Sequence, residues 1–234
     1  PLNLMPLADG NKQGNYYQKW VKSGKTRFTP TEDDMLCELQ LSAIGDFEPL
    51  KFTVDEHLFN KQIAPWQNEW VPYLRREGIS NDRTGLLLVG LDGDSPMDSL
   101  SMPEARKRVG RRLNETDFNV KTELYEQLTC LHPLLETFDT LGRTMLIKSN
   151  AGGWFPPHRD APILTRDCFR IVVFIGKHVD HMAYEWEMNG KRWPIQQNRA
   201  YYIDTRKAHR THSWQDGSIH CVVNVPKTWE NVLK

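Results

Sequence analysis

Apolar residues recur at helical spacing in two stretches of the first part of the chain, residues 53–74 and 124–142. Thr53 and Glu56 have the spacing of a capping box, so we expect the first helix to begin there. Pro133 should kink or split the second helix, because proline removes an N–H donor and clashes with the preceding turn. The pattern predicts a helical region in this part of the chain.

Short β-type runs separated by turn residues dominate the chain from Arg143 onward. We expect eight strands there, at residues 143–148, 154–159, 168–175, 182–188, 191–195, 199–204, 209–214 and 219–225. Asn189-Gly190, between the fourth and fifth of these, is typical of a two-residue hairpin turn. Two earlier strands are expected at residues 35–42 and 83–90. This series of short strands favours a cupin-like jelly roll, that is, a double-stranded β-helix.

The expected fold class is therefore mainly β with a helical N-terminal half. Residues 1–33 form an arm without sustained periodicity, residues 34–142 a helical and strand support region, and residues 143–234 the double-stranded β-helix. A chain of 234 residues is within reach of a single hydrophobic core, so we expect one structural domain overall.

The 30 basic and 30 acidic residues cancel, which removes the general attraction that non-specific nucleic-acid or membrane binding relies on. No apolar run approaches the ~20 residues of a membrane helix, and the first residues lack the pattern of a signal peptide. The four cysteines form no CxxC pair, as expected of a reduced protein. These features predict a cytoplasmic protein with neither nucleic acid nor membrane as a partner.

Three side chains have the spacing of a metal site. His158 and Asp160 lie at the end of the second expected strand of the β-rich region, and His209 begins the seventh. Residues two apart in a strand point to one face, so His158 and Asp160 can reach the same ion. Two imidazoles and one carboxylate leave about three coordination positions open, as in non-haem Fe(II) oxygenases. We therefore expect His158, Asp160 and His209 to bind iron.

His212 is an alternative to His209 as the distal ligand. Because the two lie three residues apart on an extended strand, only one of them can face the metal, and we favour His209. Asp204 is expected to help orient His209, since a metal-bound imidazole normally has a partner for its second nitrogen.

The runs GGWFPPHRDAP, CFRIVVFIG, RAYYIDTRKAHRTHSW and IHCVVNV resemble the aspartyl/asparaginyl β-hydroxylase and bacterial proline hydroxylase branch of the 2-oxoglutarate/Fe(II)-dependent dioxygenases. The resemblance covers roughly residues 143–225 and identifies His158, Asp160 and His209 as the catalytic iron ligands. It implies hydroxylation of an unactivated C–H bond with Fe(II), 2-oxoglutarate and O2, supported by ascorbate. The implied substrate is a small molecule or a peptide, in particular an amino acid or an amino-acid side chain.

One feature departs from the family. Its members anchor the remote carboxylate of 2-oxoglutarate with an arginine early in the last strand, where this chain has Ser218. Arg170 matches another family arginine near the co-substrate and is the expected cation. Ser218 and His220 would face the same side of their strand and could both donate hydrogen bonds to a carboxylate.

The absence of this arginine, with Ser218 in its place, leaves two alternatives open. The chain could be a metal-binding cupin-like module that has lost 2-oxoglutarate chemistry, or a cupin enzyme that uses the metal without 2-oxoglutarate. Neither the particular substrate nor the oligomeric state follows from the sequence.

Overall fold

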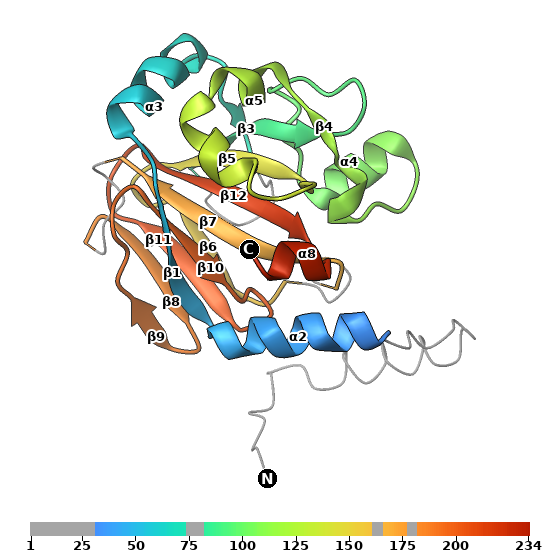
Figure 1. The fold of residues 1–234 in the computed structure, drawn as a ribbon. Helices are drawn as coiled ribbons and strands as arrows, with labels where there is room; N and C mark the ends of the chain where they lie inside the picture. Colours follow the sequence, from blue (N-terminus) through green and yellow to red (C-terminus); the bar gives the residue numbers. More distant parts are fainter. Residues whose placement is uncertain (1–30, 74–81, 161–165, 177–181) are drawn as a thin grey trace, which may run out of the picture.

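The computed structural model describes residues 31–73, 82–160, 166–176 and 182–234, and its strands form two antiparallel sheets (Figure 1). The strands of the larger sheet are β1 (Phe47–Thr53), β2 (Val71–Pro72), β3 (Arg83–Gly90), β4 (Val120–Lys121), β5 (Thr144–Ser149), β7 (Cys168–Ile175), β10 (Arg199–Ile203) and β12 (Ser218–Pro226). Their order is β1-β10-β7-β12-β5-β3-β2, with β4 also paired to β3. The smaller sheet has the order β6-β11-β8-β9, formed by β6 (Trp154–His158), β8 (Tyr184–Met188), β9 (Lys191–Trp193) and β11 (His209–Ser213).

This arrangement is a double-stranded β-helix, so the expected fold class is confirmed. Strands β5 to β12 correspond to the eight expected strands with small shifts at their ends. The expected hairpin is also present, because Met188 pairs with Lys191 and both turn residues have positive φ, 51° at Asn189 and 76° at Gly190.

Short helices occupy much of the N-terminal half. They are α2 (Glu32–Ile44), α3 (Glu56–Ile63), α4 (Met102–Val109), α5 (Glu123–Gln127) and α6 (His132–Leu135), with the 3-10 helices η1 (Ala64–Trp66), η2 (Glu115–Asp117) and η3 (Thr129–Leu131), and α8 (Trp229–Val232) follows β12. Figure 1 shows α3 and α5 near β3 and β5, whereas α2 runs along the opposite rim of the sheets, where it packs against α8. None of the described helices is long and apolar enough to cross a membrane.

The central strands of the larger sheet are buried on both faces. Along β7, Ile171 and Val173 belong to the core that includes the helices of the N-terminal half. The alternate residues Val172 and Phe174 pack instead with the aromatic side chains of β8, between the two sheets. Because strand residues alternate between faces, the same strands that hold the helices also line the interior of the jelly roll.

The strand expected at residues 35–42 is wrong, since this stretch lies within α2. The alternation of polar and apolar residues around Leu39 resembles a strand, but Thr31 and Asp34 form a capping box that starts a helix. Cys37 and Leu41, four residues apart, form the buried side of that helix.

The two expected helices are shorter than their apolar patterns. Thr53 is the last residue of β1 and pairs with Arg199, so Asp55 caps α3 instead. The second stretch is split into α5, η3 and α6, as expected from Pro133. This proline lies in the first turn of α6, where its missing N–H costs no helical hydrogen bond. The helical structure ends at Leu135 rather than at Gly142.

Strands from the support region complete the larger sheet. β1 pairs with β10, and β3 pairs with β5, so the sheet continues across the boundary expected near residue 143. Residues 1–30 of the expected arm, residues 1–33, lie outside the described part of the chain. Its last two residues belong to α2, which begins at Glu32.

Gly142 lies where two segments approach too closely for a side chain. Its N–H donates to Asn224 O at 2.7 Å, and a Cβ at this position would lie 2.9 Å from Glu115 O and 3.2 Å from Asn224 O. We predict that Gly142→Ala lowers the free energy of unfolding by about 1–3 kcal/mol, because neither backbone can move away easily. Chemical denaturation measures the change, with Thr140→Ala on the exposed surface as the control. Equal stabilities of the two variants would contradict the prediction.

Candidate metal centre

The three expected metal ligands lie together at one end of the jelly-roll interior. His158 ends β6 and His209 begins the neighbouring β11, where the two residues are paired in register. Asp160 follows β6 by two residues. One potential ligand atom from each of the three side chains lies within 4.8 Å of the others. Sequence and structure therefore agree on the juxtaposition that a mononuclear metal site needs.

Backbone carbonyl groups fix both imidazoles in a metal-ready orientation. Nδ1 of His158 lies 2.9 Å from Pro156 O, and Nδ1 of His209 lies 2.9 Å from Lys207 O. A carbonyl oxygen only accepts, so each Nδ1 carries a proton and Nε2 is the ring nitrogen left to bind a metal. The role expected for Asp204 is thus filled by the carbonyl of Lys207.

Asp160 is held at both its backbone and its side chain. Its N–H donates to Thr205 O at 3.0 Å, while Arg170 Nη1 donates to Oδ2. The other oxygen, Oδ1, lies 3.6 Å from His158 Nε2. Burial alone raises the pKa of a carboxyl group, but the Arg170 cation and the neighbouring histidines outweigh it and hold the pKa of Asp160 well below its usual value. The carboxylate is therefore charged at neutral pH and directs Oδ1 toward His158.

Arg170 belongs to a chain of buried polar groups that leads away from the histidines. Its Nε and Nη2 donate to Asn224 Oδ1 at 3.0 and 2.9 Å, and Nη2 lies 3.8 Å from Glu115. Glu115 also accepts two hydrogen bonds of 2.9 Å from Arg143. All three N–H-bearing nitrogens of Arg170 thus have protein acceptors, so a co-substrate carboxylate would compete with Asp160 or Asn224 for this guanidinium. The co-substrate role of Arg170 stays a prediction.

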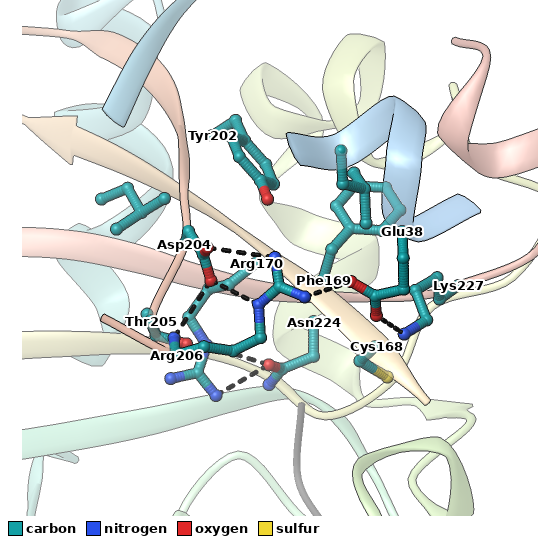
Figure 2. A pocket seen from close by; sticks show the side chains of 12 residues that line it. Glu38, Cys168, Phe169, Arg170, Tyr202, Asp204, Thr205, Arg206, Asn224 and Lys227 are labelled. Carbon is teal, nitrogen blue, oxygen red and sulfur yellow. Dashed lines mark hydrogen bonds and ion pairs between the residues drawn. The ribbon is translucent and has the colours of Figure 1, made fainter. Parts of the chain in front are cut away.

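A network of ion pairs supports the loop on which Asp160 rests (Figure 2). Arg206 donates to both oxygens of Asp204 and to Glu38 of α2, and Lys227 also donates to Glu38. Thr205, which accepts the N–H of Asp160, lies between the two charged residues of this loop. Helix α2 and the end of β12 are thereby tied to the loop between β10 and β11.

Aromatic rings surround the two histidines. Trp186 stacks on His209 with ring centroids 5.6 Å apart and an interplanar angle of 5°, and Phe155 meets His158 edge-on at 4.1 Å. Burial, with the nearby His158 as the second cause, lowers the pKa of His209 to about 4. His209 is therefore neutral near pH 7, the state that binds a metal ion.

A cavity of about 340 Å³ extends from the candidate ligands into the jelly roll. It lies within the size range of small-molecule sites. His220 lines it, and Ser218 is buried two residues away on the same face of β12, 3.2 Å from Ser213 Oγ. Both residues therefore face inward as expected, although their contact with a co-substrate stays a prediction.

Sequence reasoning missed two charged residues of this cavity, Arg83 and Glu115. Arg83 begins the otherwise apolar run RTGLLLVG, for which the sequence predicts only a strand. A long cation at the start of such a run is the one signal that could have identified it, because a buried charge normally has a counter-charge. Glu115 gives no comparable signal in the sequence.

The whole arrangement is a jelly roll with a candidate metal site of two histidines and one aspartate. No family model matches the sequence, and no curated protein matches it. Among solved structures, this chain is similar to a 2OG-Fe(II) oxygenase family oxidoreductase from Burkholderia pseudomallei, with 15% identity, a TM-score of 0.47 and coverage of 86% of this chain and 93% of that one.

Two further solved structures illustrate the range of similarity. A prolyl hydroxylase from Trichoplax adhaerens, in complex with a hypoxia inducible factor oxygen degradation domain peptide fragment, has 11% identity and a TM-score of 0.46 over 97% of this chain and 99% of that one. An RmlC-like cupin from Desulfovibrio desulfuricans has 12% identity and a TM-score of 0.27 over 35% and 70% of the two chains.

The buried His220 predicts an acid-sensitive fold. Burial and, second, the nearby Arg83 lower the pKa of His220 to about 3, compared with about 6.5 in an unfolded chain. Between these values the unfolded chain binds a proton that the folded protein does not, so the free energy of unfolding falls as the pH decreases from about 6.5 toward 3. We predict that His220→Leu reduces this slope by up to about 1.4 kcal/mol per pH unit, measured by urea denaturation between pH 6.5 and 4. Identical slopes in the two proteins would contradict it.

Proposed function

We propose that this protein is a 2-oxoglutarate- and Fe(II)-dependent dioxygenase that hydroxylates an unactivated C–H bond. The observation that carries the proposal is the cluster of His158, Asp160 and His209 at the end of a jelly-roll cavity. Two imidazoles and one charged carboxylate match the donor set of non-haem Fe(II) oxygenases. The sequence resemblance to the aspartyl/asparaginyl β-hydroxylase and proline hydroxylase branch points to the same chemistry.

The residues present fit Fe(II), which His158, Asp160 and His209 would hold. When bound, the iron supplies the site where 2-oxoglutarate and O2 react. In the overall reaction one oxygen atom of O2 enters succinate as CO2 is released, and the other becomes the hydroxyl group of the product. The chain's own task is to place the substrate C–H bond beside the metal and to keep bulk water away from it.

Arg170 is a positioning residue in this proposal. Because it donates to Oδ2 of Asp160, Oδ1 is the oxygen left for the metal, and this is the oxygen nearer His158. Trp186 and Phe155 limit the rotation of the two imidazoles by direct ring contact. The ligand set is thus oriented by the protein before a metal binds.

We infer a free amino acid or an amino-acid side chain in a peptide as the substrate class, in a reduced, cytoplasmic setting. The resemblance supports the substrate class. The four cysteines, all buried and free, are consistent with a reducing compartment.

The proposal predicts substrate-independent turnover of the co-substrate. Purified protein with Fe(II), ascorbate and 2-oxoglutarate should release succinate slowly, and Asp160→Ala should lower this release by at least about 100-fold, because the carboxylate ligand is lost. Asp139→Ala, which removes an exposed carboxylate paired with Lys234, is the matched control and should leave the rate unchanged.

Metal binding must be measured in the same samples by calorimetry with Mn(II). Wild-type protein that binds Mn(II) yet neither binds 2-oxoglutarate nor releases succinate would contradict the proposal. That result would favour the alternative of a metal-binding cupin-like module, or of a cupin enzyme that does not use 2-oxoglutarate.

A further inference from the structure

Arg83 is a buried cation without a counter-charge among the described residues. Its side chain lines the cavity, and the residue is 7% exposed. Nε and Nη1 are buried and have no hydrogen-bond acceptor in the described part of the chain. The guanidinium instead lies 5.1 Å from the ring centre of Phe155 and 5.7 Å from that of Tyr73. Ring contacts offset only part of the cost of burying a charge, so the absence of an acceptor needs an explanation.

Strand register places Arg83 on the inner face of the larger sheet. It pairs with Ser149 of β5, which in turn pairs with Ser218 of β12. Residues directly opposite each other in paired strands share a face, so Arg83 lies in the same row as Ser218, the position where the sequence lacks the expected arginine. The arginine that β12 lacks at Ser218 thus has a counterpart in Arg83, which lies on the same face of the sheet two strands away.

The position of Arg83 relative to the metal ligands is set by Phe155. This ring lies 4.1 Å from the His158 ring and 5.1 Å from the Arg83 guanidinium carbon. The cation is therefore separated from the candidate metal centre by about the width of one aromatic side chain. A dicarboxylate of five carbons that is held at the metal by one end could reach this guanidinium with the other.

The charges that line the cavity favour an anion. Two acidic residues line it, Glu115 and Asp160, and both are already paired with arginines. The cavity also contains five arginines, Arg83, Arg106, Arg143, Arg159 and Arg170. His220 is neutral near pH 7 because its pKa is lowered, so at its inner end Arg83 supplies the positive charge. The surplus cations suit a ligand with more than one carboxylate.

We propose that Arg83, on β3 of the support region, binds the remote carboxylate of the 2-oxo dicarboxylic acid co-substrate, with His220 and Ser218 at its side. This inference rests on the proposed function and names the group that selects the co-substrate. A guanidinium forms strong, charge-assisted hydrogen bonds with a carboxylate, and Nε and Nη1 of Arg83 both lack an acceptor among the described residues. Arg170 is less suited to the same task because Asp160 and Asn224 already accept from it.

A comparison of two ligands and two arginines tests the assignment. Mn(II)-loaded protein, which does not turn over, is titrated by calorimetry with 2-oxoglutarate and with 2-oxopentanoate, which has a methyl group in place of the remote carboxylate. Wild-type protein should bind 2-oxoglutarate at least about tenfold more tightly, the usual size of one charge-assisted contact. Arg83→Met should abolish this preference and leave binding of 2-oxopentanoate nearly unchanged.

Control variants separate the possible failures. Arg108→Met removes a surface arginine paired with Asp94 and Asp98, and it should keep the wild-type preference. An unchanged preference in Arg83→Met, or a loss of preference in Arg170→Met alone, would overturn the role of Arg83. Wild-type protein that binds Mn(II) but neither oxo acid would overturn the proposed function itself, and the role of Arg83 with it.

Stability gives an independent readout. Because two nitrogens of the buried guanidinium have no acceptor among the described residues, Arg83→Met should have a ligand-free melting temperature equal to or above that of the wild type. Added 2-oxoglutarate should then raise the melting temperature of the wild type but not of the variant. A purely structural role for Arg83 would give the opposite pattern, a lower melting temperature with the ligand response intact. If both Arg83→Met and Arg83→Gln failed to fold, Arg83 would be needed for the fold itself, and the proposal would be overturned.

Discussion

Neutralisation of buried charge governs the interior of this jelly roll. Glu115 is 1% exposed, and Arg143 is its main counter-charge. Arg170 lies between the carboxylates of Asp160 and Glu115 and also donates to Asn224. Removal of one member of such a chain leaves another charge buried without a partner, which costs more than the loss of a single hydrogen bond. The orientation of Asp160 therefore depends on a series of interactions that begins in the N-terminal half, at η2.

A second support reaches Asp160 from the opposite rim. Thr205 accepts its N–H, and the loop of Thr205 is held to α2 through Arg206 and Glu38. Helix α2 is thus connected, through Glu38 and the Arg206 loop, to the backbone of a candidate metal ligand. Ligands that are held in place before the metal arrives lose little conformational entropy on binding, which explains why so many polar contacts converge on one carboxylate.

The sequence predicted the parts of this protein that depend on local pattern. The alternation in β7 and the Asn189-Gly190 turn specify strands and a hairpin without long-range information. The spacing of His158 and Asp160 indicated the ligand pair, although Asp160 lies beyond the end of β6 and is held by Thr205 and Arg170. In α2 the apolar alternation was misleading because the buried positions, Cys37 and Leu41, are defined by the packing of that helix.

Arg83 and Glu115 escaped prediction for a different reason. Their roles depend on which strands and loops lie side by side, and register is set by long-range pairing that a single sequence does not reveal. β3 joins β5 with Arg83 opposite Ser149, so an arginine 75 residues before His158 comes to face the same interior. The boundary expected near residue 143 divides the sequence into a support region and a β-helix core. The cavity is lined by residues of both regions, such as Arg83 and Glu115 of the first and His158 and His209 of the second.

The contrast between Arg83 and the other buried charges gives the cavity its selectivity. Glu115 and Asp160 are paired with arginines within the protein, so neither needs a ligand as its counter-charge. Within the described part of the chain, Nε and Nη1 of Arg83 have no acceptor, so its burial costs free energy that a bound anion would offset. A carboxylate that meets this guanidinium therefore gains the energy of the ion pair and relieves a cost already present in the empty cavity. A monocarboxylic acid bound at the metal leaves that cost in place. The same unpaired charge therefore lowers the stability of the ligand-free protein and favours a dicarboxylate over an analogue that lacks the remote carboxylate.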